Sequence, residues 1–417
     1  MTDAGEERVA GGGLLHRRAL LVAGALSTGG LVTAVRAASQ AQSPASMRDP
    51  GAPLSGYGAR VHTSEAIQRI VPDLPFPGTG SSRTPLQLLE GTITPNDLHF
   101  ERHHNGIPEI DPAMHELLVH GLVRQPLLFR YEDLLRYPRE SRILFLECSG
   151  NSGTLAAAQP VQASAGQLNG LISAAEWTGV RLSTLLDEAG IAPSARWVQA
   201  EGADAAGMTR SIPLSLCLED AMIALFQNGE PLRPAQGFPM RLLLPGIEGN
   251  ASIKWLRRLK LIAAPAFSRE ETSKYSDLRP DGKAELFSLR MGVKSIILSP
   301  SFGLDLQGAG YREISGLAWS GRGRVRKVEV SADGGASWAE AALGDPVLPK
   351  ALTRFRMPWR WEGGPAVLMS RATDETGAVQ PLRAAWRAHY GAGQGYHSNA
   401  VQSWAIDSQG KVAHVYV

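Results

Sequence analysis

The sequence contains very little cysteine and almost no excess charge. Its 417 residues include two cysteines, Cys148 and Cys217, and 42 Lys+Arg stand against 40 Asp+Glu, a formal net charge of +2. Two cysteines are too few for a disulfide framework, a four-thiolate metal site or the Cys-x-x-Cys-His motif that attaches a c-type haem. The balanced charge argues against a nucleic-acid-binding protein that relies on the charge of the whole chain. No Gly-x-Gly-x-x-Gly dinucleotide loop is present, so redox chemistry would need another kind of cofactor.

The N-terminus has the features of an export signal. Arg17 and Arg18 form a twin-arginine pair that is followed by an apolar run over 19–35 and by small residues. This order is typical of a twin-arginine signal peptide, which we predict over residues 1–38. The alternative is a membrane anchor, but polar residues and glycines at 27–30 interrupt the run, which is shorter than the ~20 apolar residues of a spanning helix. We therefore predict a periplasmic protein without a membrane anchor, folded around a cofactor before export.

The remaining chain divides into three stretches of different composition. Residues 39–85 are rich in Ser, Ala, Pro and Gly and are predicted to be a lead-in segment with little core. Over 86–285 short apolar runs alternate with turns and plausible helices such as 181–190, which predicts an α+β domain. Over 286–417 strand and turn signals recur roughly every 8–12 residues, which predicts an immunoglobulin-like β-sandwich.

Cys148 is the first candidate functional residue. The hydrophobic strand 142–148 places it at the start of a loop of Ser, Gly and Asn. A thiolate at the end of a rigid strand, among small residues, is well placed to be a metal ligand or a nucleophile. A buried structural cysteine is the alternative, and this is the role we predict for Cys217, which lies in the apolar stretch 211–220.

Two further segments carry groups that suit an anionic ligand. The segment 100–108 holds the cluster Arg102, His103, His104 and Asn105, whose cationic and donor side chains suit a polyanionic cofactor better than a metal. Surface histidines without a ligand are the alternative. The second segment, 236–256, places Arg241, Ser252 and Lys254 around glycine-rich turns, where backbone amides and fixed cations can bind phosphate and pterin edges. A turn between strands needs no ligand, so this pattern remains ambiguous by itself.

Taken in order, the motifs resemble those of the sulfite oxidase family of molybdopterin enzymes. The resemblance covers about residues 86–417 and rests on FERHHNGIP, LECSGNSG, SIPL, NGEPL, QGFPMR, SIKWL, VEVSADGGASW, SRATDETG and HSNAVQ. It implies a sulfite-oxidase-like molybdopterin domain followed by a sandwich that serves as the dimerisation module.

The resemblance also implies roles for individual residues. Cys148 matches the cysteine whose thiolate binds molybdenum, which is also held by the dithiolene sulfurs of molybdopterin and carries oxo groups. Arg102 matches an arginine that faces both substrate and pterin, and Tyr275 matches an active-site tyrosine near the metal. The resemblance implies cofactor contacts for His103, His104, Asn105, Asp204, Gln236, Arg241, Ser252 and Lys254.

Four positions depart from the pattern of the sulfite oxidases. Gly153 and His389 stand where arginines are expected, Gln167 stands in place of a pocket tryptophan, and Gln236 in place of a cofactor-contacting histidine. Fewer fixed cations weaken a site for a small free oxyanion. Together with the segment 271–300, which resembles the sulfane-oxidising members of the family, this favours oxidation of sulfane sulfur on a carrier protein. For such a substrate the resemblance implies the release of six electrons over three cycles. The alternative is a sulfite dehydrogenase that acts on free sulfite.

The electrons need an acceptor outside this chain, because its sequence contains no haem motif. The resemblance implies a c-type cytochrome subunit as partner, a sulfur carrier protein that bears the substrate, and a homodimer within a hetero-oligomer. Two other classes remain possible from the residues alone. These are a cysteine hydrolase that uses Cys148 with a histidine of 99–104, and a non-catalytic binding protein built on the sandwich.

Overall fold

The computed structural model describes residues 9–14, 67–72, 78–391 and 396–417. The twin-arginine pair, the apolar run after it and most of the predicted lead-in segment lie outside these residues, so the predicted signal peptide stays a prediction. Within the described residues, no helix is both long enough and apolar enough to cross a membrane.

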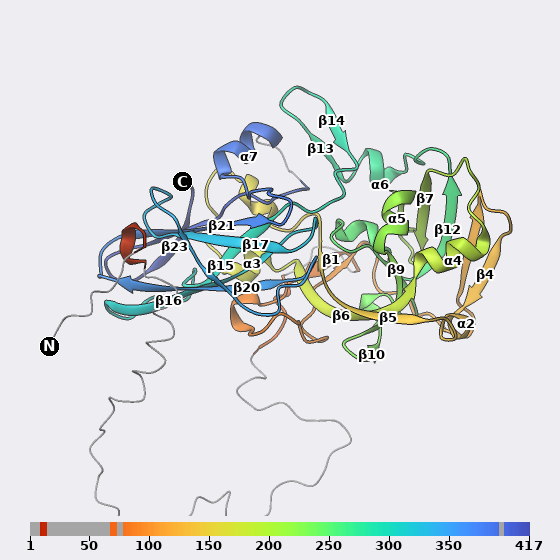
Figure 1. Ribbon diagram of the computed structural model, residues 1–417, viewed down its shortest axis with the longest axis horizontal. Coiled ribbons are helices and arrows are strands. Elements are labelled where there is room, and N and C mark those ends of the chain that lie inside the picture. Colours follow the sequence, from red (N-terminus) through yellow and green to blue (C-terminus); the bar gives the residue numbers. More distant parts are fainter. Residues whose placement is uncertain (1–8, 15–66, 73–77, 392–395) are drawn as a thin grey trace, which may run out of the picture.

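The N-terminal region (residues 78–286) is built on two sheets, the first antiparallel and the second mixed, with short helices around them (Figure 1). The first sheet has the order β10-β9-β6-β5, with β11 paired to β9. Its strands are β5 (Arg139–Glu147), β6 (Ile172–Arg181), β9 (Met222–Gln227), β10 (Glu230–Pro231) and β11 (Arg241–Leu243). The second sheet has the order β4-β3-β12-β7-β8. Its strands are β3 (Glu116–Gly121), β4 (Leu127–Arg130), β7 (Trp197–Gly202), β8 (Thr209–Pro213) and β12 (Leu256–Ile262).

Short helices cover these sheets. Helix α4 (Leu182–Ala189) buries Leu182, Leu185, Leu186 and Ala189, which is the i, i+3, i+4, i+7 stripe of an amphipathic helix. It ends at Gly190, whose φ of 72° is the left-handed conformation that glycine adopts most easily. The other short helical elements here are η4 (Leu86–Leu88), α2 (Tyr131–Leu134), η5 (Gly153–Ala156), α3 (Ala165–Asn169), α5 (Leu214–Asp220), η6 (Pro234–Gln236), η7 (Gly249–Ala251) and α6 (Arg269–Thr272). Cys217 lies on α5 and is fully buried in the core, as predicted.

The C-terminal sandwich (residues 294–417) has two antiparallel sheets with the orders β15-β16-β20-β19 and β18-β17-β21-β22-β23. The first contains β15 (Lys294–Ser299), β16 (Gly310–Trp319), β19 (Ala342–Leu343) and β20 (Thr353–Trp361). The second contains β17 (Val325–Ser331), β18 (Ala339–Glu340), β21 (Ala366–Asp374), β22 (Ser403–Ile406) and β23 (Val412–Val415). The basic run 322–327 overlaps the start of β17, where Val325 and Val328 are buried and Arg326 is exposed, so Arg326 lies on the solvated face of this strand. The prediction of an α+β fold followed by a sandwich is confirmed.

Strand β20 and helix α7 are among the elements that were not predicted from the sequence. Strand β20 contains Pro358 among alternating basic residues, a pattern that argues against a central strand. Pro358 is tolerated because β19 pairs only with Phe355 and Arg356, so near the proline β20 is hydrogen-bonded mainly to β16. Helix α7 (Arg383–Tyr390) buries Trp386 alone, which is too little apolar periodicity to be recognised.

The two regions share one apolar core. Phe145 of β5 and Ile172 of β6 are buried in the same cluster as the sandwich residues Trp319 and Phe355. Between the regions a hairpin of β13 (Ser276–Leu278) and β14 (Ala284–Leu286) projects from the molecule (Figure 1). The end of the lead-in also belongs to the fold, because β1 (Gly80–Ser82) pairs with β2 (Glu101–His103) and supports the cluster of histidines.

Candidate cofactor site

One cavity brings the candidate residues together. It lies where the loop after β5, the strand β2 and the loops around β11 meet. Arg102, His103, His104, Cys148, Asp204, Gln236, Arg241, Ser252, Lys254 and Tyr275 all line it. Asn105 does not line the cavity and its side chain is exposed. Segments that are more than 170 residues apart in sequence therefore form a single site.

Strand β5 carries Cys148 to this cavity. The peptide N–H of Cys148 donates to the carbonyl of Leu171 over 2.9 Å, and its carbonyl accepts from the N–H of Asn151 over 2.8 Å. Gly249 passes close to this turn, since a Cβ there would lie 2.7 Å from the carbonyl oxygen of Glu147. Burial raises the pKa of the Cys148 thiol, while the N–H of Gly150 and the charge of Arg102 lower it. A metal cation bound next to Cys148 would favour its thiolate over the protonated thiol.

A chain of polar groups holds His103 at the cavity wall. Nδ1 of His103 lies 2.9 Å from Nζ of Lys254, and Nε2 lies 3.2 Å from a carboxylate oxygen of Glu101. Arg69 from the lead-in pairs with the other oxygen of Glu101. Burial, aided by the charge of Lys254, lowers the pKa of His103 to about 3. Neutral His103 therefore accepts from Lys254 at Nδ1 and donates from Nε2 to Glu101.

Lys254 is held by three acceptors. Nζ donates to the carbonyl oxygens of Arg102 (3.0 Å) and Ala235 (3.1 Å) as well as to His103. It also lies 4.3 Å from the centre of the Trp255 ring. Lys254 therefore joins the histidine segment to the loop before β11, and its positive charge faces the cavity.

Arg241 is a buried cation that the described protein groups do not neutralise. Its side chain is 2% exposed, and its Nη1 and Nη2 donate to the carbonyls of Gln236 (3.1 Å) and Ser252 (3.0 Å). Its Nε has no hydrogen-bond partner, and no carboxylate of the described chain forms an ion pair with it. Burial lowers the pKa of Arg241 to about 9. A buried guanidinium without a counter-charge is costly, so this wall of the cavity fits an anionic group.

Tyr275 faces His104 across the cavity. The phenol oxygen lies 3.0 Å from Nε2 of His104, and the guanidinium of Arg210 lies 5.3 Å from the phenol ring. Burial raises the pKa of Tyr275, and burial together with Arg102 lowers the pKa of His104 to about 4. The pair is therefore a neutral phenol beside a neutral imidazole, which can donate to an oxygen without carrying charge.

The other predicted cofactor contacts lie deeper. Gln236 is 4% exposed and donates to the carbonyl of Phe100 over 2.9 Å. Ser252 accepts the N–H of Leu244 over 3.0 Å, and Asp204 accepts the N–H of Met208 over 3.3 Å. These bonds place the three side chains in the wall and leave part of their hydrogen-bonding capacity for a ligand.

Three of the positions that depart from the sulfite oxidase pattern do not line the cavity. Gln167 is exposed and closes the N-terminus of α3, where its side chain accepts the N–H of Ser164 over 2.9 Å. His389 is on α7, with a 45% exposed side chain near Glu285. Gly153 begins η5, and a Cβ there would meet no atom within 4 Å. These three replacements therefore do not change the lining of the cavity.

Several cavity residues were missed in the sequence. Trp255 and Asn250 lie within the predicted segment 236–256, but they were not predicted as site residues, because an indole or an amide in a loop does not by itself indicate a ligand. Phe100 and Met208 supply apolar wall. Arg210 of β8 donates a hydrogen bond to Asn250. It could not be predicted from the sequence, because nothing in TRSIP indicates which face of that strand meets the site.

The donor set decides what kind of cofactor the cavity fits. Within the described residues, no group of three or more His, Cys, Asp and Glu side chains is arranged to hold a metal ion. One thiol and several fixed cations instead suit a soft metal that an anionic organic ligand brings with it. The site is thus that of an oxidoreductase with a metal held by an anionic, sulfur-rich cofactor.

Comparison with known proteins agrees with this class. Residues 104–269 match the oxidoreductase molybdopterin binding domain, and residues 286–403 match the Mo-co oxidoreductase dimerisation domain. The mitochondrial sulfite oxidase of Mus musculus is 32% identical over 71% of this chain and 59% of that protein. The sulfite oxidase of Gallus gallus is 31% identical over 72% of this chain and 71% of that protein. The chain spans about three fifths of the length of the mammalian relatives.

This chain is also similar to a solved structure, and the similarity covers nearly the whole length of both chains. The sulfane dehydrogenase SoxCD from Paracoccus pantotrophus is 43% identical, covers 91% of this chain and 98% of its own, and has a TM-score of 0.87. The chain therefore belongs to the sulfite oxidase family of molybdopterin-dependent oxidoreductases. The resemblance inferred from the sequence motifs, including its likeness to a sulfane dehydrogenase, is confirmed.

Proposed function

We propose that this chain is the molybdenum-bearing subunit of a sulfane dehydrogenase, which oxidises sulfur presented on a carrier protein. One observation carries the proposal. The thiol of Cys148 shares a cavity with the buried cation Arg241, whose charge no carboxylate of the described chain neutralises. A soft metal donor and an anion-binding wall in one cavity are what a molybdenum–molybdopterin cofactor requires.

Each wall of the cavity has its own task in this proposal. Cys148 would hold the metal, while Arg241, Ser252 and Lys254 would bind the anionic part of the pterin. Gln236, Asp204 and His103 would contact its ring edges. When bound, the cofactor would supply oxygen-atom transfer to sulfur and accept two electrons in each cycle.

The chain's own residues would orient the substrate. Arg102 faces the cavity as a cation and attracts the developing oxyanion. Tyr275 can donate its hydroxyl proton to the same oxygen when the Nε2–H of His104 donates to the phenol oxygen. Tyr275 and His104 are both neutral, so Arg102 would supply the positive charge that attracts the oxyanion of the substrate.

Sulfane sulfur on a carrier is favoured over free sulfite by two observations. Gly153 and His389 stand where the sulfite oxidase pattern has arginines, so the chain has fewer fixed cations than that pattern. The structural similarity extends over 98% of a sulfane dehydrogenase chain. Free sulfite remains the second candidate, because the curated relatives of this family include sulfite oxidases.

The partners and the location complete the proposal. Electrons would leave one at a time to a c-type cytochrome subunit, because this sequence has no haem-attachment motif. The sandwich would form a homodimer, in line with its match to a dimerisation domain. The twin-arginine pair would direct the folded protein to the periplasm.

The test compares two substrates with one enzyme. The exported protein is purified, its molybdenum is measured, and haem reduction is followed in the presence of the cytochrome. Carrier protein loaded with sulfane sulfur should reduce the haem much faster than free sulfite does. Equal or faster reduction by sulfite would assign the chain to sulfite dehydrogenases, and a purified protein without molybdenum would contradict the cofactor itself.

A further inference from the structure

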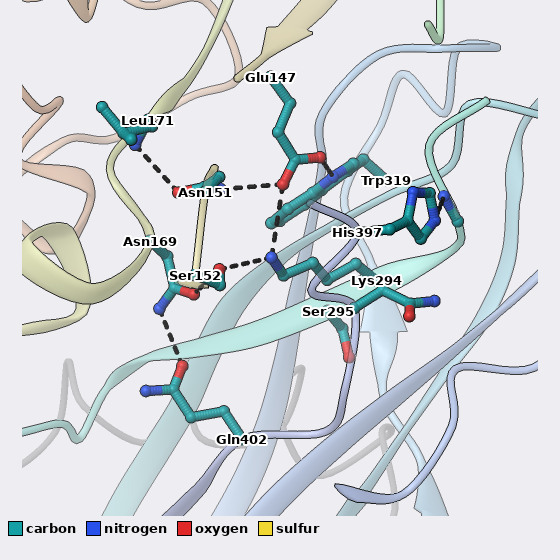
Figure 2. A network of polar contacts seen from close by, with 12 residues as sticks. Glu147, Asn151, Ser152, Asn169, Leu171, Lys294, Ser295, Trp319, His397 and Gln402 are labelled. Carbon is teal, nitrogen blue, oxygen red and sulfur yellow. Dashed lines mark hydrogen bonds and ion pairs between the residues drawn. The ribbon is translucent and has the colours of Figure 1, made fainter. Parts of the chain in front are cut away.

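The residue before Cys148 points away from the cavity into the boundary with the sandwich. Successive side chains of a strand take opposite faces, so Cys148 lines the cavity while Glu147 does not. Glu147 is 1% exposed, yet both of its oxygens are bonded (Figure 2). One oxygen accepts the indole N–H of Trp319 over 2.7 Å, and the other accepts from Asn151 over 2.9 Å. Nζ of Lys294 lies 3.4 Å from that second oxygen.

Lys294 and Trp319 come from one rung of the sandwich. They are direct partners in the antiparallel pair of β15 and β16, so their side chains take the same face of that sheet. Lys294 is 1% exposed and Trp319 is completely buried. The sandwich therefore presents an ammonium and an indole N–H, side by side, to the carboxylate that precedes Cys148.

The same ammonium also holds the loop after Cys148. Nζ of Lys294 donates to Oγ of Ser152 over 2.5 Å, and that hydroxyl donates to Asn169 over 2.6 Å. Asn169 in turn donates to Gln402 of the sandwich over 2.8 Å, as Figure 2 shows. Ser152 has a φ of 61°, a left-handed conformation that a serine adopts only when its surroundings hold it. Both ends of the turn that carries Cys148 are thus bonded to Lys294.

Stability alone does not account for this arrangement. Burying two charges removes both from water, and a buried ion pair often stabilises a protein no more than apolar residues of similar volume would. Such a pair does, however, define one geometry, because each charge tolerates few other partners. The polar network therefore has the properties of a positioning device.

We propose that Lys294 and Trp319 are positioning residues for the Cys148 thiol, so that the sandwich forms part of the metal site as well as a dimerisation module. This inference takes one assumption from the proposed function, which is that Cys148 is the metal ligand. The position of the thiol can be tested with and without the metal.

The experiment uses Lys294→Met and Trp319→Phe in the full chain, with Lys350→Met as matched control. Lys350 is also a buried lysine of the C-terminal region, and its Nζ bonds Glu219 and Asp220, which do not line the cavity. Trp319→Phe keeps an aromatic ring, but it loses the N–H donor and part of the ring volume. In cofactor-free protein, alkylation of Cys148 by iodoacetamide is followed by peptide mass spectrometry, with buried Cys217 as internal reference. In metal-loaded protein, the g-values of the Mo(V) electron paramagnetic resonance signal are measured.

Both network variants should alkylate Cys148 about tenfold faster than the wild type, because the turn opens more often. Their g-values should shift, while Lys350→Met should leave both readouts at wild-type values. Unchanged alkylation and unchanged g-values in Trp319→Phe would overturn the proposal, even if Lys294→Met failed to fold. A wild type without molybdenum would contradict the proposed function, but the alkylation rates would still decide this inference.

Discussion

The hydroxyl of Tyr275 lies 3.0 Å from Nε2 of His104, although 171 residues separate them in the sequence. The contact joins the segment before β13 to the histidine cluster after β2 and closes one side of the cavity. Tyr275 adopts a φ of 49°, so its backbone is held in an unusual conformation that directs the ring inward. The pair is the neutral donor and acceptor that an oxygen passing through the site would meet.

Tyr275→Phe should therefore slow turnover without unfolding the protein. Loss of one donor at a developing oxyanion lowers kcat by about 100- to 1000-fold, whereas one lost hydrogen bond costs about 1 kcal/mol of stability. Steady-state kinetics and thermal unfolding measure the two effects. Full kcat in this variant would remove Tyr275 from the catalytic residues, and loss of cofactor would indicate a structural role instead.

Cys148→Ser should abolish metal retention and lower turnover more than about a hundredfold, because a hydroxyl is a poor ligand for a metal held by sulfur. Cys217→Ala is the matched control. Cys217 is completely buried on α5, so this variant should lose about 1–2 kcal/mol of unfolding free energy and keep its molybdenum. Molybdenum content by elemental analysis separates the two. Turnover by a metal-free Cys148→Ser protein would contradict the assignment of Cys148 as the metal ligand.

Lys254→Met should destabilise the protein and impair cofactor binding. The change leaves the carbonyls of Arg102 and Ala235 and Nδ1 of His103 without their donor, which costs roughly 3 kcal/mol in total. Lys260→Met, at an exposed position of β12, should change the unfolding free energy by less than about 0.5 kcal/mol. Urea unfolding checks both variants. Equal midpoints would mean that Lys254 does not hold the histidine segment.

Arg241→Lys should reduce the stabilisation that the cofactor confers. The lysine keeps a charge but cannot reproduce the planar fork that bonds the carbonyls of Gln236 and Ser252. A ligand that binds the folded state raises the unfolding temperature according to its affinity, so the difference between loaded and cofactor-free protein should shrink. Arg181→Lys, which alters a surface pair with Glu140, should leave that difference unchanged. An undiminished difference in Arg241→Lys would place the anionic part of the cofactor elsewhere.

Buried histidines should make the protein less stable in acid. Burial lowers the pKa of His397 to about 4, below its ordinary value of 6.5. Between these pH values the unfolded chain binds the proton and the folded chain does not, so stability is complete above pH 6.5 and falls toward pH 4. The loss is about 1.4 kcal/mol per pH unit for this one group.

His397→Gln tests that prediction. The variant should lose less unfolding free energy than the wild type on going from pH 7 to pH 5, by about 2 kcal/mol. Denaturant titrations at both pH values provide the measurement. Parallel losses in the two proteins would show that His397 is accessible to protons in the folded state.

Much of the site could be predicted because its residues sit in short, ordered motifs. The strand before Cys148 is recognisable from its apolar run, and the clusters at 102–105 and 236–256 from their cations and glycines. The same reasoning placed Asn105 among the cofactor contacts, although its side chain is exposed and does not line the cavity. Adjacent residues in a loop look equivalent in a motif, but the backbone turn at Gly106 sends their side chains in different directions.

Other parts could not be predicted, because they depend on how distant elements pack. Gln167 and His389 were placed in the pocket by motif alignment, yet they lie at a helix N-terminus and on an exposed helix face. Arg210 reaches the site from β8. The alternation of residues along a strand indicates which face of the sheet a side chain is on, but not which part of the molecule packs against that face. Nothing in LECSG or VKSIIL indicates that Glu147 and Lys294 pair.

By itself the sequence determined the order of the elements, the shift from a mixed domain to a sandwich, and the thiol and cations that define the chemistry. Apolar periodicity, glycine turns and motif order are local properties, so they can be recognised in the sequence without knowledge of the fold. Only the tertiary structure decided that no carboxylate among the described residues pairs with Arg241, that His103 is neutral, and that the sandwich holds the turn around Cys148. These features arise from burial and from contacts across more than 100 residues, which exist only once the chain has folded.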